Sequence, residues 1–293
     1  MLWFLVPIVL VVVYATLVER FWFAIRRADL AILPKGAKEI TILHISDIHM
    51  APWQRRKQQW IKKLAALKPD LVINTGDNLG HSKAIPSVLT SLSDLNQISG
   101  VFVNGSNDMF APSVRNPFTY FSSPSKAHPP SHQKLETSLL NSAFTDKGWI
   151  NLNNATAKLL INGVRLSFIG TDDAHENLAD LSNLKPLATS DLVIGVTHAP
   201  YLTVLSELNQ KGAELIFAGH THGGQVCWPF TGRALVTNCD LPTRYARGLA
   251  QLELQPGQKF WLNVCAGLGN SIFAPIRFAC RPEIRLVTLR AKN

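Results

Sequence analysis

The sequence predicts an α/β protein in which strands and helices alternate and pack in layers. Three observations support this fold class. Short apolar runs of strand length recur between residues 40 and 218, stretches with helical spacing lie between them, and each run ends at polar side chains. The chain has 293 residues, of which 46% are hydrophobic, so it can bury the core of one large domain or two small ones.

The strand-like runs are each followed by polar residues that could bind a ligand. Open α/β sheets carry their sites at the carboxyl ends of strands, so we expect these polar residues to meet at one edge. Helices are expected over residues 55–68 and 201–210. The five apolar runs cover residues 40–46, 70–75, 100–104, 192–196 and 214–218.

The first 18 residues are apolar and contain no charge. Their length is about the minimum for a membrane span, which takes ~17 to 25 residues. A secretory signal would carry basic residues before the apolar run and a small-residue cleavage site after it, and this segment has neither. We therefore expect a retained N-terminal apolar anchor helix that is no part of the globular core.

Basic residues gather beside this segment. Between Glu19 and Lys68 there are 11 Lys or Arg against 4 Asp or Glu, an excess of 7 out of a net charge of +9. Lys and Arg residues next to a membrane span favour a cytoplasmic position for that end of the span, and they attract anionic lipid. We expect residues 1–33 to form a membrane anchor with a basic juxtamembrane segment, and residues 34–293 to form one domain facing the cytoplasm. No nucleic-acid-binding signature is present, so no nucleic-acid binding is expected.

The segment 216–225, IFAGHTHGGQ, is the strongest candidate for a metal site. If its extended geometry persists, His220 and His222 point to the same side of the strand. Gly219 and Gly223 let the backbone approach a ligand closely. Imidazole is a common ligand for Zn and suits Fe, and Mn sites accept it beside carboxylates. A surface turn with two histidines is the alternative.

The strand ends together supply enough ligands for two divalent ions. In a dinuclear centre one carboxylate commonly bridges ions that lie ~3.5 to 4 Å apart. Any one of these residues could be a helix cap or a core group, but ligands at five separate strand ends favour a site. The candidate ligands are Asp47, His49, Asp77, Ser106 or Asn107, His198, His220 and His222.

The order of these motifs resembles the calcineurin-like metallophosphoesterases, and especially their small, membrane-associated bacterial members. The motifs are DIH at 47–49, GDN at 76–78, GSND at 105–108, THAP at 197–200 and GHTHGG at 219–224. The resemblance covers about residues 40–290. It implies a four-layer αββα sandwich of two mixed sheets, placed at the inner or plasma membrane of a bacterium, with two divalent ions (Mn, Fe or Zn).

The resemblance also implies how the ligands divide between the ions. Asp77 would bridge the pair. Asp47, His49 and His222 would hold the first ion, and His198 and His220 the second.

One motif departs from the family pattern. The usual Gly-Asn-His-Asp/Glu is here GSND, so Ser106 replaces the metal-binding Asn and Asn107 replaces the catalytic His. We expect the Asn107 amide oxygen to serve as a ligand of the second ion, because a neutral Ser hydroxyl is a poorer one. His81 and His175 are candidates for the missing proton donor, and the alternative for each is a solvated loop histidine.

The expected activity is that of a metal-dependent phosphoric ester hydrolase, a phosphatase of mono- or diesters. A metal-bound hydroxide would attack phosphorus, Asp77 would hold the ions together, and Asn107 and His81 would assist. Asn107, His175 and Arg277 are expected to bind the phosphoester substrate, and the loop 112–130 could form a lid.

Two other functions remain open at this stage. The altered GSND motif could mark a catalytically degenerate metal-binding scaffold at the membrane lipid surface. An amidohydrolase or peptidase could also use a dinuclear centre. The sequence determines neither the metal nor the oligomeric state.

Overall fold

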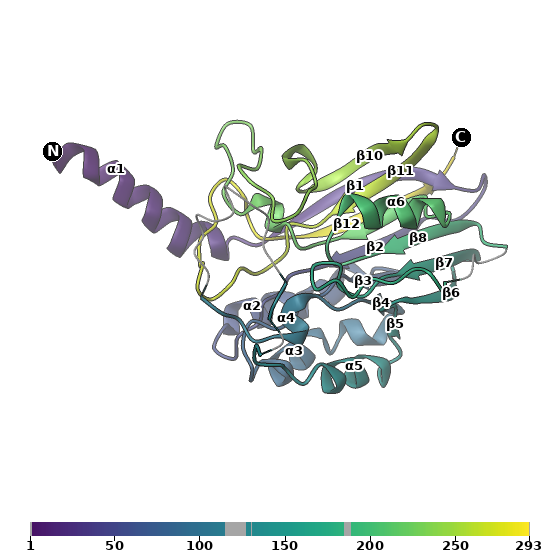
Figure 1. Cartoon of the computed structure of the whole chain (residues 1–293), viewed down its shortest axis with the longest axis horizontal. Coiled ribbons are helices and arrows are strands. Elements are labelled where there is room, and N and C mark those ends of the chain that lie inside the picture. The colour runs from purple at the N-terminus through teal and green to yellow at the C-terminus, as the bar shows by residue number, and fades with distance from the viewer. Residues whose placement is uncertain (1, 115–126, 130, 185–188, 293) are drawn as a thin grey trace.

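The structure, a computed structural model, describes residues 2–114, 127–129, 131–184 and 189–292. Its core is a pair of six-stranded sheets, each containing parallel and antiparallel pairs. Figure 1 shows the two sheets facing each other, with helices on the outer faces. These two mixed sheets with their helices confirm the predicted layered α/β fold.

The first sheet carries the three strands expected from the amino-terminal motifs. Its central strands are parallel, whereas the strand near the carboxyl terminus is antiparallel to its neighbour in the sheet centre. Its order is β1 (Ala24–Leu33), β12 (Glu283–Ala291), β2 (Ile40–Ile45), β3 (Leu71–Asn74), β4 (Gly100–Phe102) and β5 (Ile150–Asn151).

The second sheet carries the other two expected strands at its centre, in parallel pairing. Antiparallel hairpins form both of its edges. Its order is β10 (Gly248–Gln255), β11 (Gln258–Val264), β9 (Leu215–Ala218), β8 (Leu192–Val196), β7 (Val164–Gly170) and β6 (Ala155–Ile161).

The main hydrophobic core lies between the two sheets. Ile42 and Ile73 of the first sheet belong to the same buried cluster as Phe168, Ile194 and Phe217 of the second. All five side chains are almost completely buried. Because successive residues of a strand face opposite sides, the other face of each sheet must be covered by helices.

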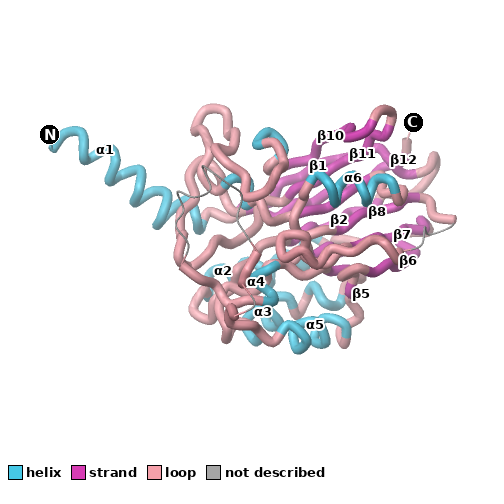
Figure 2. Tube along the Cα trace, viewed as in Figure 1, coloured by secondary structure: helices cyan, strands magenta, loops and turns pink. Residues whose placement is uncertain are grey.

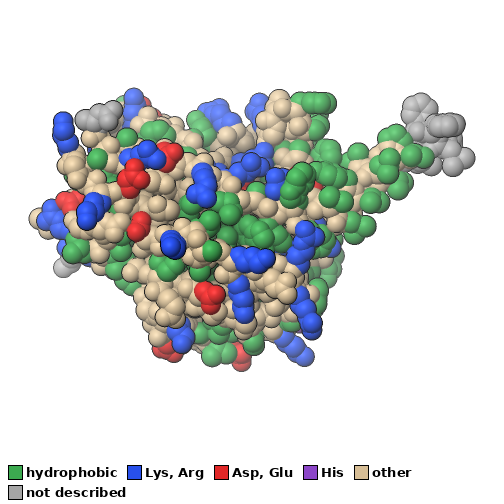
Figure 3. Space-filling model, turned by 180° about the vertical axis from the view of Figure 1, so that it is seen from behind, with side chains coloured by type: hydrophobic (Ala, Val, Ile, Leu, Met, Phe, Trp, Pro, Cys, Tyr) green, Lys and Arg blue, Asp and Glu red, His purple; other side chains and the backbone are tan. Residues whose placement is uncertain are grey.

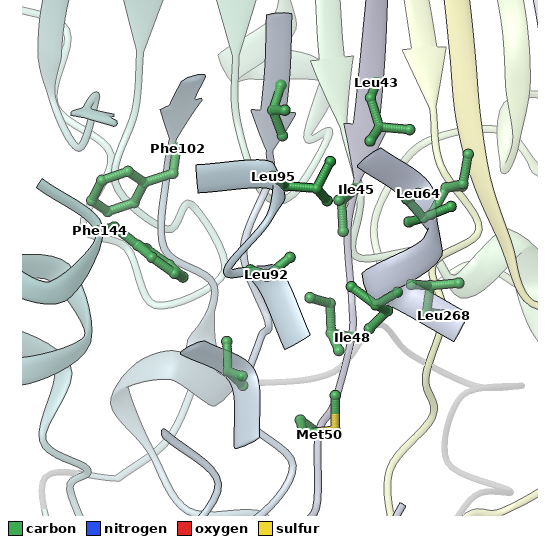
Figure 4. Close-up of a cluster of buried hydrophobic side chains, with 14 of the residues drawn as sticks. Leu43, Ile45, Ile48, Met50, Leu64, Leu92, Leu95, Phe102, Phe144 and Leu268 are labelled. Atoms are coloured by element: carbon green, nitrogen blue, oxygen red, sulfur yellow. The ribbon is translucent and has the colours of Figure 1, made fainter. Parts of the chain in front are cut away.

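Helices cover the outer face of the first sheet. They are α2 (Arg55–Lys62) with the 3₁₀ turn η3 (Lys63–Leu67), α3 (Ile85–Leu92), followed by the 3₁₀ turn η4 (Leu95–Gln97), and α5 (Thr137–Thr145). Figure 4 shows Leu43 and Phe102 from strands beside Leu64, Leu92 and Phe144 from these helices. The expected helix over residues 55–68 is therefore present, but its last turn tightens into 3₁₀ geometry and ends at Lys68 with a φ of 49°.

A single helix, α6 (Leu202–Gln210), packs on the outer face of the second sheet. Its Leu205 and Leu208 are fully buried against Ile216 and Leu262. This helix agrees with the expectation for residues 201–210. The tube in Figure 2 shows that much of the remaining chain forms long loops at the edge of the sheets nearest α1 (Leu2–Val13).

The amino-terminal segment does not form the expected spanning helix. Helix α1 ends at Val13, a π-helical stretch η1 (Tyr14–Val18) follows, and then a 3₁₀ turn η2 (Glu19–Phe21). Within the described ranges, no helix combines the length and the apolar character needed to cross a membrane. Figure 1 shows α1 projecting away from the body of the protein.

The end of this segment packs on the domain, contrary to the expectation that it stays outside. Ala15 and Glu19 are 1% and 2% exposed. The Glu19 carboxylate accepts the backbone N–H of Ala279 (2.9 Å) and Cys280 (2.6 Å), and the Ala15 carbonyl accepts the N–H of Arg277 (3.1 Å). A buried carboxylate needs such donors, so these bonds hold the segment against the loop 277–280.

Strand β1 also lies inside the segment 1–33 that was expected to be anchor and flank. It pairs with β12 in parallel along most of its length, from Ala24 opposite Glu283 onward. Its charged residues Arg26 and Arg27 are exposed, as is usual for an edge strand. The sheet therefore begins before residue 34.

The core between the sheets gives a stability prediction. Replacing Phe168 by Ala removes a fully buried ring and should lower the free energy of unfolding by about 3–5 kcal/mol, measured by urea denaturation. Leu160→Ala on the neighbouring strand is the control, because Leu160 is 70% exposed and its loss should cost under about 0.5 kcal/mol. Equal losses for the two variants would contradict this position of the core.

Candidate metal centre

The candidate ligands follow strands of both sheets and meet at one edge. Asp47 and His49 follow β2, Asp77 follows β3, and His198 follows β8. The loop after β9 brings in two more histidines. The fold therefore gathers residues that are up to 175 positions apart in the chain, between 47 and 222.

Four residues form a compact set that could hold one cation. Ligand atoms of Asp47, His49, Asp77 and His222 all lie within 4.8 Å of one another. The Nε2 atom of His49 lies 3.3 Å from an oxygen of Asp77, and Nε2 of His222 lies 3.7 Å from an oxygen of Asp47. Two carboxylates and two imidazoles are a suitable donor set for Mn, Fe or Zn.

A second group of donors lies directly beside the first and shares Asp77 with it. The Nε2 atom of His198 lies 3.6 Å from Oδ2 of Asp77 and 3.3 Å from Nδ1 of His220. The opposite nitrogen of His198, Nδ1, lies 2.7 Å from the carbonyl oxygen of Thr75. This bond fixes the ring so that Nε2 points toward Asp77, the usual arrangement for a ligating histidine.

Unsatisfied imidazole nitrogens also fit a cation site. Among the described residues, Nδ1 of His49 and Nε2 of His220 are buried and have no hydrogen-bond partner. Buried polar atoms are normally satisfied, because each unsatisfied one costs about 1–3 kcal/mol. A bound cation would satisfy nitrogens of both rings, so the residues present fit the metals that the motifs imply.

The backbone of the site is unusual. Asp47, His49, Asp77, His220 and His222 all have positive φ, between 42° and 66°. Residues other than glycine rarely adopt this conformation, which costs about 1–3 kcal/mol and clusters at functional sites.

The expected alternation of His220 and His222 along a strand is wrong, because β9 already ends at Ala218. The two rings instead join different ligand sets.

Two glycines allow the loops to meet. A Cβ at Gly105 would collide with Asp77 and with the ring of His198. A Cβ at Gly219 would collide with the side chains of Ser46 and Asp47. Glycine is thus required at both positions by close packing around the ligands.

The charges at the site suit metal binding. Burial alone would raise the pKa of Asp77, but the positive charge of His198, followed by the nearby His49 ring, holds it well below its usual value. Burial lowers the pKa of His220 and His222 well below the ordinary histidine value, so both rings are neutral near pH 7. Ionised carboxylates and neutral imidazoles are the forms that bind a cation.

His198 differs from the other histidines. Burial alone would lower its pKa, but the carboxylates of Asp77 and Asp173 raise it to about 9. The ring therefore carries a proton near neutral pH when no cation is bound, and binding a cation at Nε2 requires the release of that proton.

Asp108, which was not among the candidate site residues, supports the metal loops from behind. Its buried carboxylate accepts the backbone N–H of Asn78 (2.7 Å), Leu79 (3.2 Å) and Gly105 (3.2 Å). Burial, and then the charge of Asp77, raises the pKa of Asp108 to about 6. Its place in the GSND motif was the sequence signal for this role.

Asn107 contacts Asp77 through two donors. Its backbone N–H and its side-chain Nδ2 each lie 2.8 Å from an oxygen of Asp77. The amide nitrogen thus faces the carboxylate, so ligation of a cation by the amide oxygen stays a prediction. Ser106 is buried, and together with Asn107 it lines a cavity beside the candidate ligands.

Two expected site residues lie elsewhere. His81 is not among the residues that line the cavity, and its Nδ1 accepts the backbone N–H of Lys83. Arg277 is fully buried and donates to the carbonyl oxygens of Ala266 (2.8 Å) and His222 (3.0 Å). Arg277 therefore holds the loop that carries His222, and a direct contact of its guanidinium with substrate stays a prediction.

Four of the candidate ligands, His49, Asp77, His220 and His222, line a cavity of about 290 Å³. One wall is apolar and contains Leu235, Phe273 and Ile276. His175 also lines the cavity, with its Nδ1 3.1 Å from the hydroxyl oxygen of Tyr201. Most of the proposed lid at 112–130, including residues 115–126, lies outside the described residues.

Comparison with known proteins places the chain among related sequences. A family model described as calcineurin-like phosphoesterase matches residues 40–224, which is more than half of the chain. An uncharacterized metallophosphoesterase of Aquifex aeolicus is 27% identical over 272 residues, covering 89% of this chain and 88% of its own. A transmembrane protein with a metallophosphoesterase domain from Bos taurus is 25% identical over 280 residues, covering 88% and 55%. The solved structure of TT1561 from Thermus thermophilus covers 79% of this chain and 91% of its own, at 12% identity and a TM-score of 0.42.

Asp108 gives a prediction about the support of the metal loops. Asp108→Asn replaces one acceptor oxygen by an NH₂ group, which faces backbone N–H donors and cannot accept from them. The free energy of unfolding at pH 8 should fall by about 1–3 kcal/mol, measured by thermal and urea denaturation. Asp146→Asn, on an exposed residue, should change it by less than about 0.5 kcal/mol. An Asp108→Asn protein as stable as wild type would show that these hydrogen bonds contribute little.

Proposed function

Because the chain belongs to the calcineurin-like phosphoesterase family and is a metal-dependent phosphoesterase, we propose that it hydrolyses a phosphomonoester or phosphodiester with two divalent ions. The observation that carries this proposal is the position of Asp77. Its carboxylate lies beside His49 of one donor set and His198 of the other, as a bridging ligand must.

The chemistry divides between ions and protein. When bound, two divalent ions would make hydroxide available near neutral pH and stabilise charge on the phosphoryl oxygens. The protein holds Asp77 in place with the two N–H groups of Asn107, and it positions His198 through the carbonyl oxygen of Thr75. The cavity above these residues would receive the phosphoester.

The two alternatives fit these observations less well. A degenerate scaffold would have no need to hold five of these aspartate and histidine residues in strained backbone conformations. An amidohydrolase or peptidase is disfavoured by membership of a phosphoesterase family. We therefore favour phosphoester hydrolysis over both alternatives.

The proposal predicts a strict dependence on Asp77 and on metal. Asp77→Asn should reduce kcat/KM for 4-nitrophenyl phosphate or bis(4-nitrophenyl) phosphate by at least about 100-fold in the presence of Mn²⁺. Loss of a residue that only supports a metal ligand already costs ~10–100-fold, and loss of the shared ligand itself should cost more. Chelation should abolish wild-type activity, and Mn²⁺, Fe²⁺ or Zn²⁺ should restore it. Asp146→Asn is the matched control. Full activity of Asp77→Asn would contradict a shared carboxylate.

We also propose that the protein contacts a membrane through α1. The described side chains of this helix are unusually exposed for apolar residues, with Val9 at 56% and Leu10 at 62%. Figure 3 shows hydrophobic side chains along the projecting helix and Lys and Arg side chains on the adjacent surface. An apolar helix with neighbouring basic residues favours binding to anionic lipid.

This contact can be measured with vesicles. The full chain should co-sediment with vesicles of phosphatidylcholine and phosphatidylglycerol, and Leu10→Glu should weaken binding at least about tenfold because a buried charge costs ~2.5–3.5 kcal/mol. Leu160→Glu, on the exposed face of β6, should bind as wild type does. Equal binding by both variants would contradict a role for α1.

A further inference from the structure

One residue outside the predicted ligand set also lines the cavity beside the candidate metal centre, and a buried glutamate holds it there. His128 lines the cavity together with His49, Asp77 and Asn107. Its side chain is only 7% exposed. The sequence interpretation placed His128 in a possible lid and gave it no role.

Glu176 holds His128 with two bonds. The ring Nδ1 of His128 lies 2.7 Å from Oε1 of Glu176, and the backbone N–H of His128 donates to Oε2 at 2.9 Å. The Glu176 side chain is 4% exposed. Burial alone would raise the pKa of Glu176, but the hydrogen bonds from His128 keep it below the usual value. Glu176 is therefore an anion that accepts both N–H groups.

Neighbouring rings fix the plane of the imidazole. The ring of Phe110 stacks on His128 with centroids 4.9 Å apart, and the ring of His132 lies 4.6 Å away on centroids. His132 is itself tied to the carbonyl oxygen of Ala111 at 2.7 Å. Because Phe110 and Ala111 directly follow α4 (Ser106–Met109), these contacts tie His128 to the end of the short helix that carries Asn107.

The GSND motif leaves the reaction without its usual histidine. Asn107 is a neutral amide that cannot transfer a proton to an alkoxide, and His81 lies outside the cavity. His175 is in the cavity, but its ring lies 5.0 Å from that of His220 and its Nδ1 contacts Tyr201. Its Nε2 is 3.9 Å from Oε1 of Glu176, so both ring nitrogens of His175 lie near protein side chains.

We propose that His128, oriented by Glu176, is the catalytic residue that protonates the leaving oxygen of the substrate. This inference rests on the proposed phosphoesterase function. As water attacks phosphorus, the bond from phosphorus to the leaving oxygen breaks with its electron pair on that oxygen. The oxygen takes the proton from Nε2 of His128. The attacking water releases a proton to solvent, and a proton from solvent restores His128.

The test compares esters that differ in their need for a proton. Phenoxide or an alkoxide requires protonation as it leaves, whereas 4-nitrophenoxide does not. With Mn²⁺ present, His128→Gln in the full chain should lower kcat for phenyl esters about 100-fold or more, and for the matching 4-nitrophenyl esters by less than about threefold, because acid catalysis contributes ~10²–10⁴-fold.

Two further measurements separate a proton donor from a structural residue. The loss of wild-type kcat on phenyl esters at high pH should disappear in His128→Gln. Glu176→Gln should show the same preference for 4-nitrophenyl esters to a smaller extent, because it disturbs only the orientation of the ring. Asp146→Asn, on an exposed residue away from the cavity, is the control and should keep the wild-type ratio of the two rates.

Two outcomes would overturn the role of His128. One is an equal loss on both esters, and the other is an unchanged ratio of rates in His128→Gln. Asp77→Asn, assayed alongside, keeps this result distinct from the proposed function. Activity retained in Asp77→Asn would overturn the dinuclear phosphoesterase, whereas its loss together with an unchanged ratio in His128→Gln would overturn only the proton donor.

Discussion

The structure depends on keeping one buried carboxylate, that of Asp77, charged between imidazoles. An isolated carboxylate in such a place would be costly, because burial removes its hydration. Two N–H groups from Asn107 and the rings of His49 and His198 compensate for that loss. Within the part of the chain that the structure describes, Nδ1 of His49 and Nε2 of His220 have no hydrogen-bond partner. The fold thus stabilises the anion while leaving room for cations to complete the site.

The surrounding framework is built to hold strained loops rather than to supply chemistry itself. Asp108 accepts N–H groups from two loops beside the candidate ligands, and Arg277 donates to the carbonyl oxygens of His222 and Ala266. Each is a buried charge that makes several hydrogen bonds to backbone groups, which is the favourable way to bury one. Positive φ values at the ligands are sustained because these contacts leave the backbone few alternatives.

Much of the fold could be predicted from the sequence, because β2, β3, β4, β8 and β9 are apolar runs that stop abruptly at polar residues. The family motifs then supplied candidate ligands, of which the structure brings Asp47, His49, Asp77 and His222 within 4.8 Å of one another. Other features depend on contacts between distant segments, which periodicity cannot reveal. His128 meets Glu176 across 48 positions, and β1 was hidden because its apolar residues follow a segment that is itself apolar. The expected strand geometry at His220 failed because the chain turns immediately after Ala218.

The position of β1 changes what can be removed from the amino terminus. A chain shortened to begin at residue 34 would lose the parallel partner of β12 and leave a long, unpaired sheet edge open to other chains. It would also lose Glu19, so the N–H groups of Ala279 and Cys280 would need new acceptors. For this protein, an attempt to improve solubility by trimming the apolar end beyond Val18 would therefore damage the architecture and invite aggregation.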